Sequence, residues 1–140
     1  MREPTEFEVG GARYRATRLS AMEQVHLAAR IAPILTALRE SAGKASTLGP
    51  MVIMDAAISA LNDLPPDRLE SIIAMCVNTV QRQKPGDTGW VAVWNARGKL
   101  PMFDDIGGAE LLAITAHVVM AEIGPFWQGL ASSLSGLVQA

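Results

Sequence analysis

The chain has 140 residues, a formal net charge of −2 at pH 7 and one cysteine, Cys76. This length is typical of a single domain over residues 1–140, and the lone cysteine, which has no internal disulfide partner, predicts a reducing compartment. The near-neutral charge argues against nucleic-acid binding, and the lack of a cleavable leader or an apolar run of about 18 residues predicts a soluble protein that is neither exported nor inserted in a membrane.

Apolar residues make up 49% of the chain and charged residues only 19%, against a typical charged share of about 25%. This composition indicates that some apolar surface is kept for a partner.

The first predicted element is a β-hairpin around Gly10-Gly11, a dipeptide that suits a two-residue primed turn. Apolar and polar residues alternate on both sides of it. One face is then aromatic, and opposite charges neutralise two of the nearby arginines, which weakens a nucleic-acid reading. The predicted cross-strand pairs are Val9 with Ala12, Glu8 with Arg13, Phe7 with Tyr14, and Glu6 with Arg15.

A helix is expected to begin at Ser20, because Ser20 and Glu23 have the spacing of a capping box. Its apolar stripe runs to about Ala42, but Pro33 removes an internal hydrogen bond and predicts a kink or break near Arg30. The stripe consists of Leu27, Ile31, Ile34, Leu35 and Leu38. Residues 43–49 are predicted to form a loop.

A second helix is predicted after Pro50, from Met51 to Leu61, with Asp55 as its only charged residue. Two interpretations are open. It is either the core helix of a small bundle, or Met51 and Met54, with Met75, line an adaptable apolar groove, since unbranched thioethers repack around different partners.

The next helix follows the prolines at 65 and 66, and its regular apolar stripe predicts that it continues through Arg82. Cys76 lies on its buried side. The stripe consists of Leu69, Ile72, Ile73, Cys76 and Val80, opposed by Glu70, Asn78, Gln81 and Arg82. Residues 84–89 form a turn-rich connector.

The aromatic stretch from Trp90 to Ile106 changes the pattern again. Residues 90–94 alternate as a short strand, residues 95–98 suit a turn, and residues 100–103 return antiparallel or as a loop, since Pro101 lacks a ladder N–H. Asp104 or Asp105 is expected to cap the helix that follows.

The last predicted helix spans about residues 107–123 and is stopped by Gly124-Pro125. The uncharged tail after it, residues 126–140, has two open interpretations: a C-terminal helix docked on the bundle, or a partner-binding segment. Taken together, these elements predict a mainly α (α+β) fold with an N-terminal β-hairpin, a small bundle of four to five helices, and a short aromatic β-hairpin or loop before the last helices.

No arrangement of residues predicts catalysis, a cofactor or a metal. His26 and His117 belong to no metal-binding motif, and Asp104-Asp105 is explained by capping. The Ser20, Glu23 and His26 set is likewise explained by capping, because the serine is engaged with the backbone. An enzyme is therefore not expected.

Several short pieces occur in a recognisable order along the chain. They are Phe7-Glu-Val-Gly-Gly-Ala-Arg-Tyr-Arg-Ala, Leu19, Ala28-Ala-Arg-Ile-Ala-Pro-Ile-Leu35, Trp90, Trp94, Met102-Phe-Asp-Asp-Ile106 and Gly124-Pro-Phe126. In this order they resemble the tail assembly chaperones of tailed bacteriophages. The resemblance covers nearly the whole chain, and the tail after Phe126 departs from it. It implies a small protein of the host cytoplasm that binds the tape measure protein, keeps it soluble until tail tube subunits assemble around it, and is absent from the finished virion.

The resemblance transfers no binding residues, so the partner-binding prediction comes from the apolar excess. The predicted partner-binding residues, expected to be more exposed than core residues, are Met51, Met54, Phe126, Trp127, Leu130 and Leu134. The expected partners are the tape measure protein and, secondarily, the tail tube protein, without nucleic acid or membrane. The alternative function is that of a minor structural tail or neck component of the virion.

Overall fold

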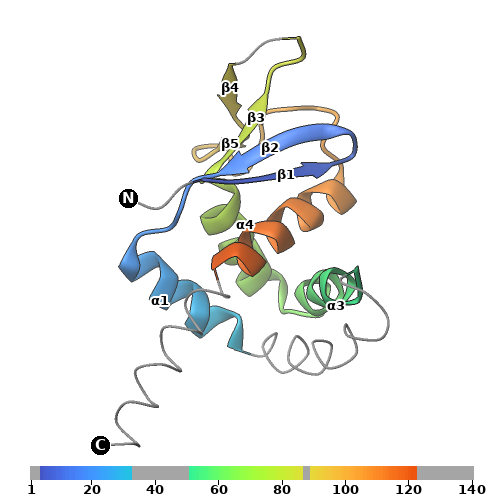
Figure 1. Cartoon of the computed structure of the whole chain (residues 1–140). Helices are drawn as coiled ribbons and strands as arrows, with labels where there is room; N and C mark the ends of the chain where they lie inside the picture. Colours follow the sequence, from blue (N-terminus) through green and yellow to red (C-terminus); the bar gives the residue numbers. More distant parts are fainter. Residues whose placement is uncertain (1–3, 33–50, 87–88, 123–140) are drawn as a thin grey trace, which may run out of the picture.

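The structure is a computed structural model that describes residues 4–32, 51–86 and 89–122, with the backbone alone described at residues 51–54. A sheet forms one end of the molecule and the helices lie beneath it (Figure 1). The described elements, in chain order, are β1 (Thr5–Val9), β2 (Ala12–Ala16), α1 (Ala21–Arg30), α3 (Met51–Asn62), α4 (Pro66–Val77), β3 (Val80–Gln83), β4 (Trp90–Ala92), β5 (Trp94–Asn95), β6 (Leu100–Pro101) and a helix over residues 108–122.

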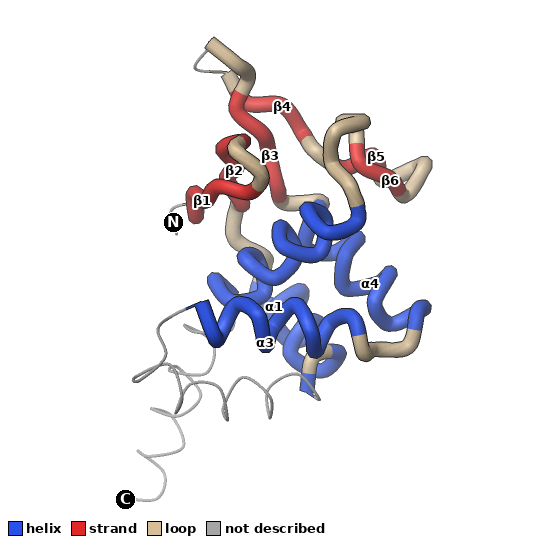
Figure 2. Tube along the Cα trace, turned by 90° about the vertical axis from the view of Figure 1, so that its right-hand side faces the viewer, coloured by secondary structure: helices blue, strands red, loops and turns tan. Residues whose placement is uncertain are grey.

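The strands form two small antiparallel sheets, one with the order β1-β2-β3-β4 and one made of β5 and β6 (Figure 2). With four helices among the described residues, the fold is α+β, as predicted. These four helices belong to the predicted bundle of four to five.

The N-terminal hairpin forms with the predicted register, including Phe7 opposite Tyr14. Gly10 and Gly11 have φ angles of 59° and 81°, which an L side chain adopts only with strain, so the two glycines make the tight turn accessible. The charged partners differ from the prediction. Arg13 makes a diagonal ion pair with Glu6 at 3.6 Å, while Arg15 turns to the neighbouring strand.

Arg15 leaves Glu6 because β3 and β4 offer it better partners. Its Nε donates to the side-chain oxygen of Gln81 at 2.7 Å, and its guanidinium lies 4.6 Å from the centre of the Trp90 ring. A planar guanidinium gains from both a hydrogen bond and an aromatic face. Arg15 therefore connects three strands of the sheet.

The helix that follows the prolines at 65 and 66 was predicted to continue through Arg82, and this prediction is wrong. Helix α4 ends at Val77, and residues 80–83 form β3, an inner strand paired with β2 and β4. Thr79 helps to end the helix, because its hydroxyl donates to the Cys76 carbonyl at 2.7 Å. Val80 is buried in the observed strand and would also be buried in the predicted helix. The apolar stripe alone therefore did not reveal where the helix ends and the strand begins.

Helix α1 begins as predicted and ends where a kink or break was expected, near Arg30, and the part of the predicted stripe beyond residue 32 lies outside the described residues. Ser20 and Glu23 form the reciprocal capping box, and the helix ends at Arg30 with Ile31 as its C-cap. The predicted 43–49 loop, the 124–125 stop and the conformation of the 126–140 tail lie outside the described residues.

The single strand predicted over residues 90–94 is divided at Val93: β4 pairs with β3 in the main sheet, while β5 pairs with β6 in the second sheet, with Trp94 opposite Pro101. The capping prediction for the two aspartates is wrong. The helix begins at residue 108, and Asp105 instead forms two hydrogen bonds with Arg82, at 2.8 and 2.7 Å.

The core lies between the sheet and the helices, and every described helix contributes to it. The 108–122 helix runs beneath the β1–β2 hairpin (Figure 1), and His117 stacks on Phe7 with ring centroids 4.6 Å apart. The largest fully buried side chains are those of Tyr14, Leu19, Leu27, Ile31, Leu61, Ile72, Ile114, Val77, Val80, Val93 and Val118.

Candidate functional site

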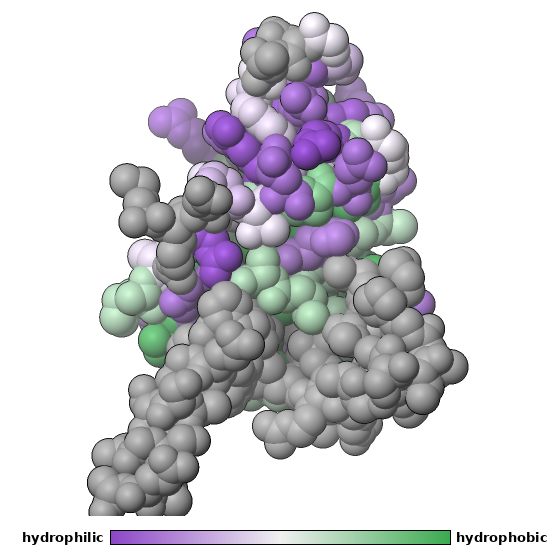
Figure 3. Space-filling view, in the orientation of Figure 1, coloured by the Kyte–Doolittle hydropathy of each residue, from purple (hydrophilic) through white to green (hydrophobic). Residues whose placement is uncertain are grey.

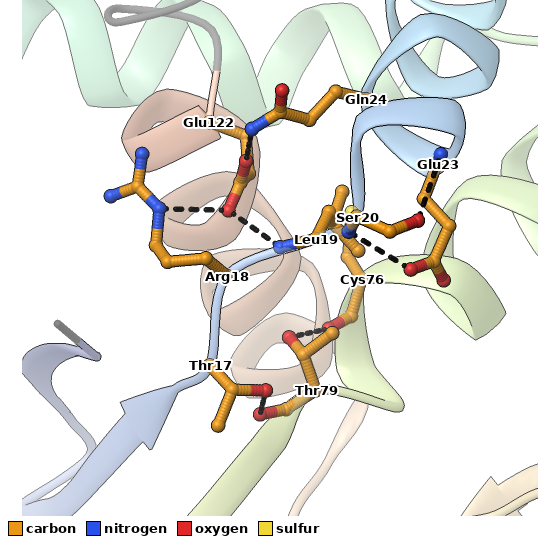
Figure 4. A network of polar contacts seen from close by, with 9 residues as sticks. All are labelled: Thr17, Arg18, Leu19, Ser20, Glu23, Gln24, Cys76, Thr79 and Glu122. Carbon is orange, nitrogen blue, oxygen red and sulfur yellow. Dashed lines mark hydrogen bonds and ion pairs between the residues drawn. The ribbon is translucent and has the colours of Figure 1, made fainter. Parts of the chain in front are cut away.

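A buried carboxylate, Glu122, joins the end of the last described helix to the segment before α1 (Figure 4). It is 2% exposed. One of its oxygens accepts a hydrogen bond from the Leu19 amide at 3.1 Å, and the other accepts from the Gln24 side chain at 2.8 Å. Buried carboxylates need such partners, because desolvation otherwise disfavours the charge. Glu122 thus fixes where α1 starts.

Arg18 adds the opposite charge to this cluster. Its Nε lies 3.2 Å from the Glu122 carboxylate, close enough for an ion pair, but the angle makes no hydrogen bond. The Glu122 carboxylate is thus held by a backbone N–H, by the side-chain amide of Gln24 and by the Arg18 cation, which is a structural role. It is not arranged to transfer a proton to a bound molecule.

Cys76 lies in the core beneath the same segment and has no exposed surface. Burial, and secondarily the charge of Glu122, raise the pKa of the Cys76 thiol. A thiol in this environment stays protonated at neutral pH and is a poor nucleophile. Cys76 is therefore a core residue.

Arg82 on β3 fastens the segment that leads into the 108–122 helix. It pairs with Asp105, and its guanidinium lies 4.7 Å from the centre of the Phe103 ring. The hydrogen bond from Arg82 lowers the pKa of the Asp105 carboxyl, although that carboxyl is open to solvent. The pair positions the loop that carries Phe103.

Large apolar side chains are exposed in two places among the described residues. Met22 and Val25 on α1 are 66% and 52% exposed, and Leu100 and Met102 at the β5–β6 hairpin are about equally open. On the face seen in Figure 3, apolar atoms reach the surface along α1, whereas hydrophilic residues dominate the sheet end. These apolar positions suit contact with another protein rather than a small molecule.

The surface of the described residues includes two hollows of different character. The first is polar and open, and it lies between the tip of the β1–β2 hairpin and residues 82–86. The second, a cleft of about 470 Å³, lies between α4, the β5–β6 hairpin and the start of the 108–122 helix. Neither gathers buried ionisable groups toward one point, as a catalytic pocket would.

The six predicted partner-binding residues are not tested by the structure. Met51 and Met54 lie in the first turn of α3, where only the backbone is described. Phe126, Trp127, Leu130 and Leu134 lie outside the described residues. Met75, the third residue of the suggested methionine groove, is half-buried and packs against the core.

Glu122 and the exposed face of α1 were not among the residues predicted from the sequence. Glu122 follows Val118 by four positions within an apolar stripe, and a carboxylate at a core-facing position was the available signal. Met22 and Val25 are three apart and fall outside the buried stripe that contains Leu27, which was the signal for a second apolar face.

Within the described residues, no group of three or more metal-ligating side chains comes together, and no helix is long and apolar enough to cross a membrane. Ser20 and Glu23 are occupied by capping, with Ser20 accepting from the Glu23 amide at 3.3 Å. They therefore form no nucleophile set with His26.

Three comparisons with known proteins address the family of the chain. No curated protein and no solved structure matches the chain. A family model described as phage tail assembly chaperone protein, TAC, matches residues 10–134. That match runs from the turn of the first hairpin to beyond the last described helix, and so the chain belongs to the phage tail assembly chaperone family.

Proposed function

We propose that this chain binds the tape measure protein during tail assembly and keeps it soluble until the tail tube protein assembles around it. In this proposal the whole chain acts as one domain in the host cytoplasm, performs no catalysis and does not remain in the virion. The observation that carries it is the apolar face of α1, where Met22 is 66% and Val25 52% exposed.

This face has the geometry of a helix-binding surface. Met22, Val25 and Ala29 are spaced i, i+3 and i+7, so they form one exposed stripe along α1. The opposite side of the helix is anchored through buried Leu27 and through the Gln24 hydrogen bond to Glu122. The stripe is thus presented on a fixed support, which lowers the conformational cost of binding.

A tape measure protein provides a matching partner. Long helical proteins with apolar faces aggregate before assembly unless those faces are covered. A helix laid against α1 would cover such a face through side chains at helical spacing. The six residues predicted from the sequence remain part of this proposal as a second contact region.

The test is co-expression with the tape measure protein encoded by the same phage. We expect the tape measure protein to be soluble and to copurify with this chain, and to aggregate without it. Mass spectrometry of purified virions separates the alternative function, because a minor tail or neck component would be present in the particles. A tape measure protein that stays equally soluble without this chain contradicts the proposal.

A further inference from the structure

The cleft between α4 and the β5–β6 hairpin is lined by residues of three elements. One wall is a single stripe of α4, whose residues Asp67, Glu70, Ser71 and Ala74 are spaced i, i+3, i+4 and i+7. The rest of the cleft is lined by Trp94 and Lys99 of the β5–β6 hairpin and by Leu111 of the 108–122 helix. Figure 2 shows the hairpin placed over α4 on this side of the molecule.

The walls of the cleft are held in place from behind. Helix α4 is anchored by Ile72, Cys76 and Val77, which have no exposed surface. The hairpin is tied to the main sheet through Val93, whose amide donates to the Val80 carbonyl of β3 at 3.2 Å and whose carbonyl accepts from the Met102 amide at 2.6 Å. A cleft with fixed walls is available to a ligand without rearrangement.

The inner surface of the cleft is apolar and its rim is charged. Ile73, Ala74, Trp94 and Leu111 are half-buried, so each still has surface to offer. Asp67 and Glu70 are exposed on the α4 side and have no ion-pair partner among the described residues. The positive N-terminal end of the α4 dipole stabilises the charge of Asp67, which lies in the first turn. This stabilisation falls off beyond the first turn and does not extend to Glu70.

These features select one kind of occupant. An apolar floor with carboxylates on its α4 rim complements an amphipathic helix whose aliphatic stripe carries lysine or arginine on the flank that faces α4. A strand is disfavoured, because it would need a backbone edge to pair with, and β6 is only two residues long. A helix needs side-chain surface only, and this cleft supplies it.

We infer that the cleft between α4 and the β5–β6 hairpin binds a basic amphipathic helix of the tape measure protein, with the aliphatic side chains against Trp94 and Leu111 and a cation beside Glu70. This inference rests on the proposed function and assigns part of the binding to a surface other than α1. Lys99, on the hairpin rim, forms an ion pair with an acidic residue on the other flank of the same helix.

The test uses fluorescence anisotropy with synthetic peptides of about seven helical turns that tile the tape measure protein of the same phage. Two variants address the cleft: Glu70→Lys reverses the charge of an exposed rim residue, and Ala74→Arg places a long cation over the apolar floor. The matched control is Asp55→Lys, which reverses an exposed carboxylate on α3. Thermal unfolding of each variant verifies that it is folded.

We expect the tightest peptide to be basic and amphipathic, and its affinity to fall about tenfold or more in both cleft variants but not in the control. A peptide in which the cation is exchanged for glutamate should bind Glu70→Lys better than it binds the wild type. Equal binding by the wild type and both cleft variants overturns this inference while leaving the proposed function intact. A tape measure protein that the full wild-type chain neither binds nor solubilises overturns both.

Discussion

Glu122 and Arg18 form a charge pair in which the carboxylate is almost fully enclosed and the guanidinium is largely so. Removing one member of such a pair leaves the other charge desolvated and unpaired. We expect Glu122→Leu to lower the free energy of unfolding by about 3 kcal/mol, and Glu122→Gln by roughly 1–2 kcal/mol, since glutamine still accepts from the Leu19 amide.

Urea denaturation of both variants measures these losses. The double variant Arg18→Met, Glu122→Leu provides the control, because it removes both charges and should regain much of the lost stability. If Glu122→Leu alone unfolds at the same urea concentration as the wild type, the carboxylate does not hold α1 in place.

His117 is half-buried against Phe7, and this burial lowers the pKa of its imidazole. The unfolded chain therefore binds a proton at His117 more readily than the folded chain does. Stability from this residue is intact above the unfolded pKa of about 6.5 and falls as the pH is lowered from there toward the folded pKa.

The expected result is that His117→Gln flattens the dependence of unfolding free energy on pH between about 7 and 5. The measurement is a series of urea denaturation curves over that range. His26→Gln, which replaces the other histidine, is the control. Equal flattening by the two variants would show that His117 burial is not the cause.

The β5–β6 hairpin contains a strained residue in its turn. Lys99 has a φ angle of 55°, the left-handed region in which a side chain costs energy. We expect Lys99→Gly to raise the free energy of unfolding by about 0.5–1 kcal/mol, because glycine removes that strain. Arg97→Gly, in the same turn without a positive φ, should lower it. Differential scanning calorimetry distinguishes the two, and a lower melting temperature for Lys99→Gly refutes the prediction.

Sequence patterns predicted the elements that are determined by residues close together in the chain. The β1–β2 register follows from two glycines and alternating residues, and the start of α1 follows from Ser20 and Glu23. Strand β3 was not predictable in this way. Val80 stays in phase with the α4 stripe, while residues 81–83 show no alternation of buried and exposed positions. What makes them a strand is pairing with β2, about 66 residues away in the chain.

The candidate binding surfaces likewise depend on residues that are distant in the sequence. From the apolar excess a partner surface was predicted and placed at six residues whose side chains lie outside the described part of the chain. The exposed face of α1 was not among them, because exposure depends on which faces the tertiary structure covers. Met22 and Val25 stay open only because α1 turns Leu27 toward the core. The α4 cleft needs three elements that are distant in sequence to meet, and no single stretch indicates it.

For the molecule as a whole, the central prediction concerns the exposed face of α1. Met22→Glu with Val25→Glu should reduce the amount of soluble tape measure protein in co-expression several-fold, because two charges would oppose an apolar contact. The variant should remain folded, since both side chains are already exposed. Ser59→Glu, at an exposed position on α3, is the control. Undiminished solubility with the double variant argues against α1 as a contact surface.

The link between Leu19 and Glu122 spans 103 positions of the chain. During synthesis, the β1–β2 hairpin and α1 emerge well before β3 and Glu122, and so the early segments must wait for late ones before they are locked. A nascent chain that stops short of residue 122 leaves the start of α1 without its anchor, and its apolar face without fixed support. The ability to hold a client should therefore appear late in translation, after the helix over residues 108–122 has been made.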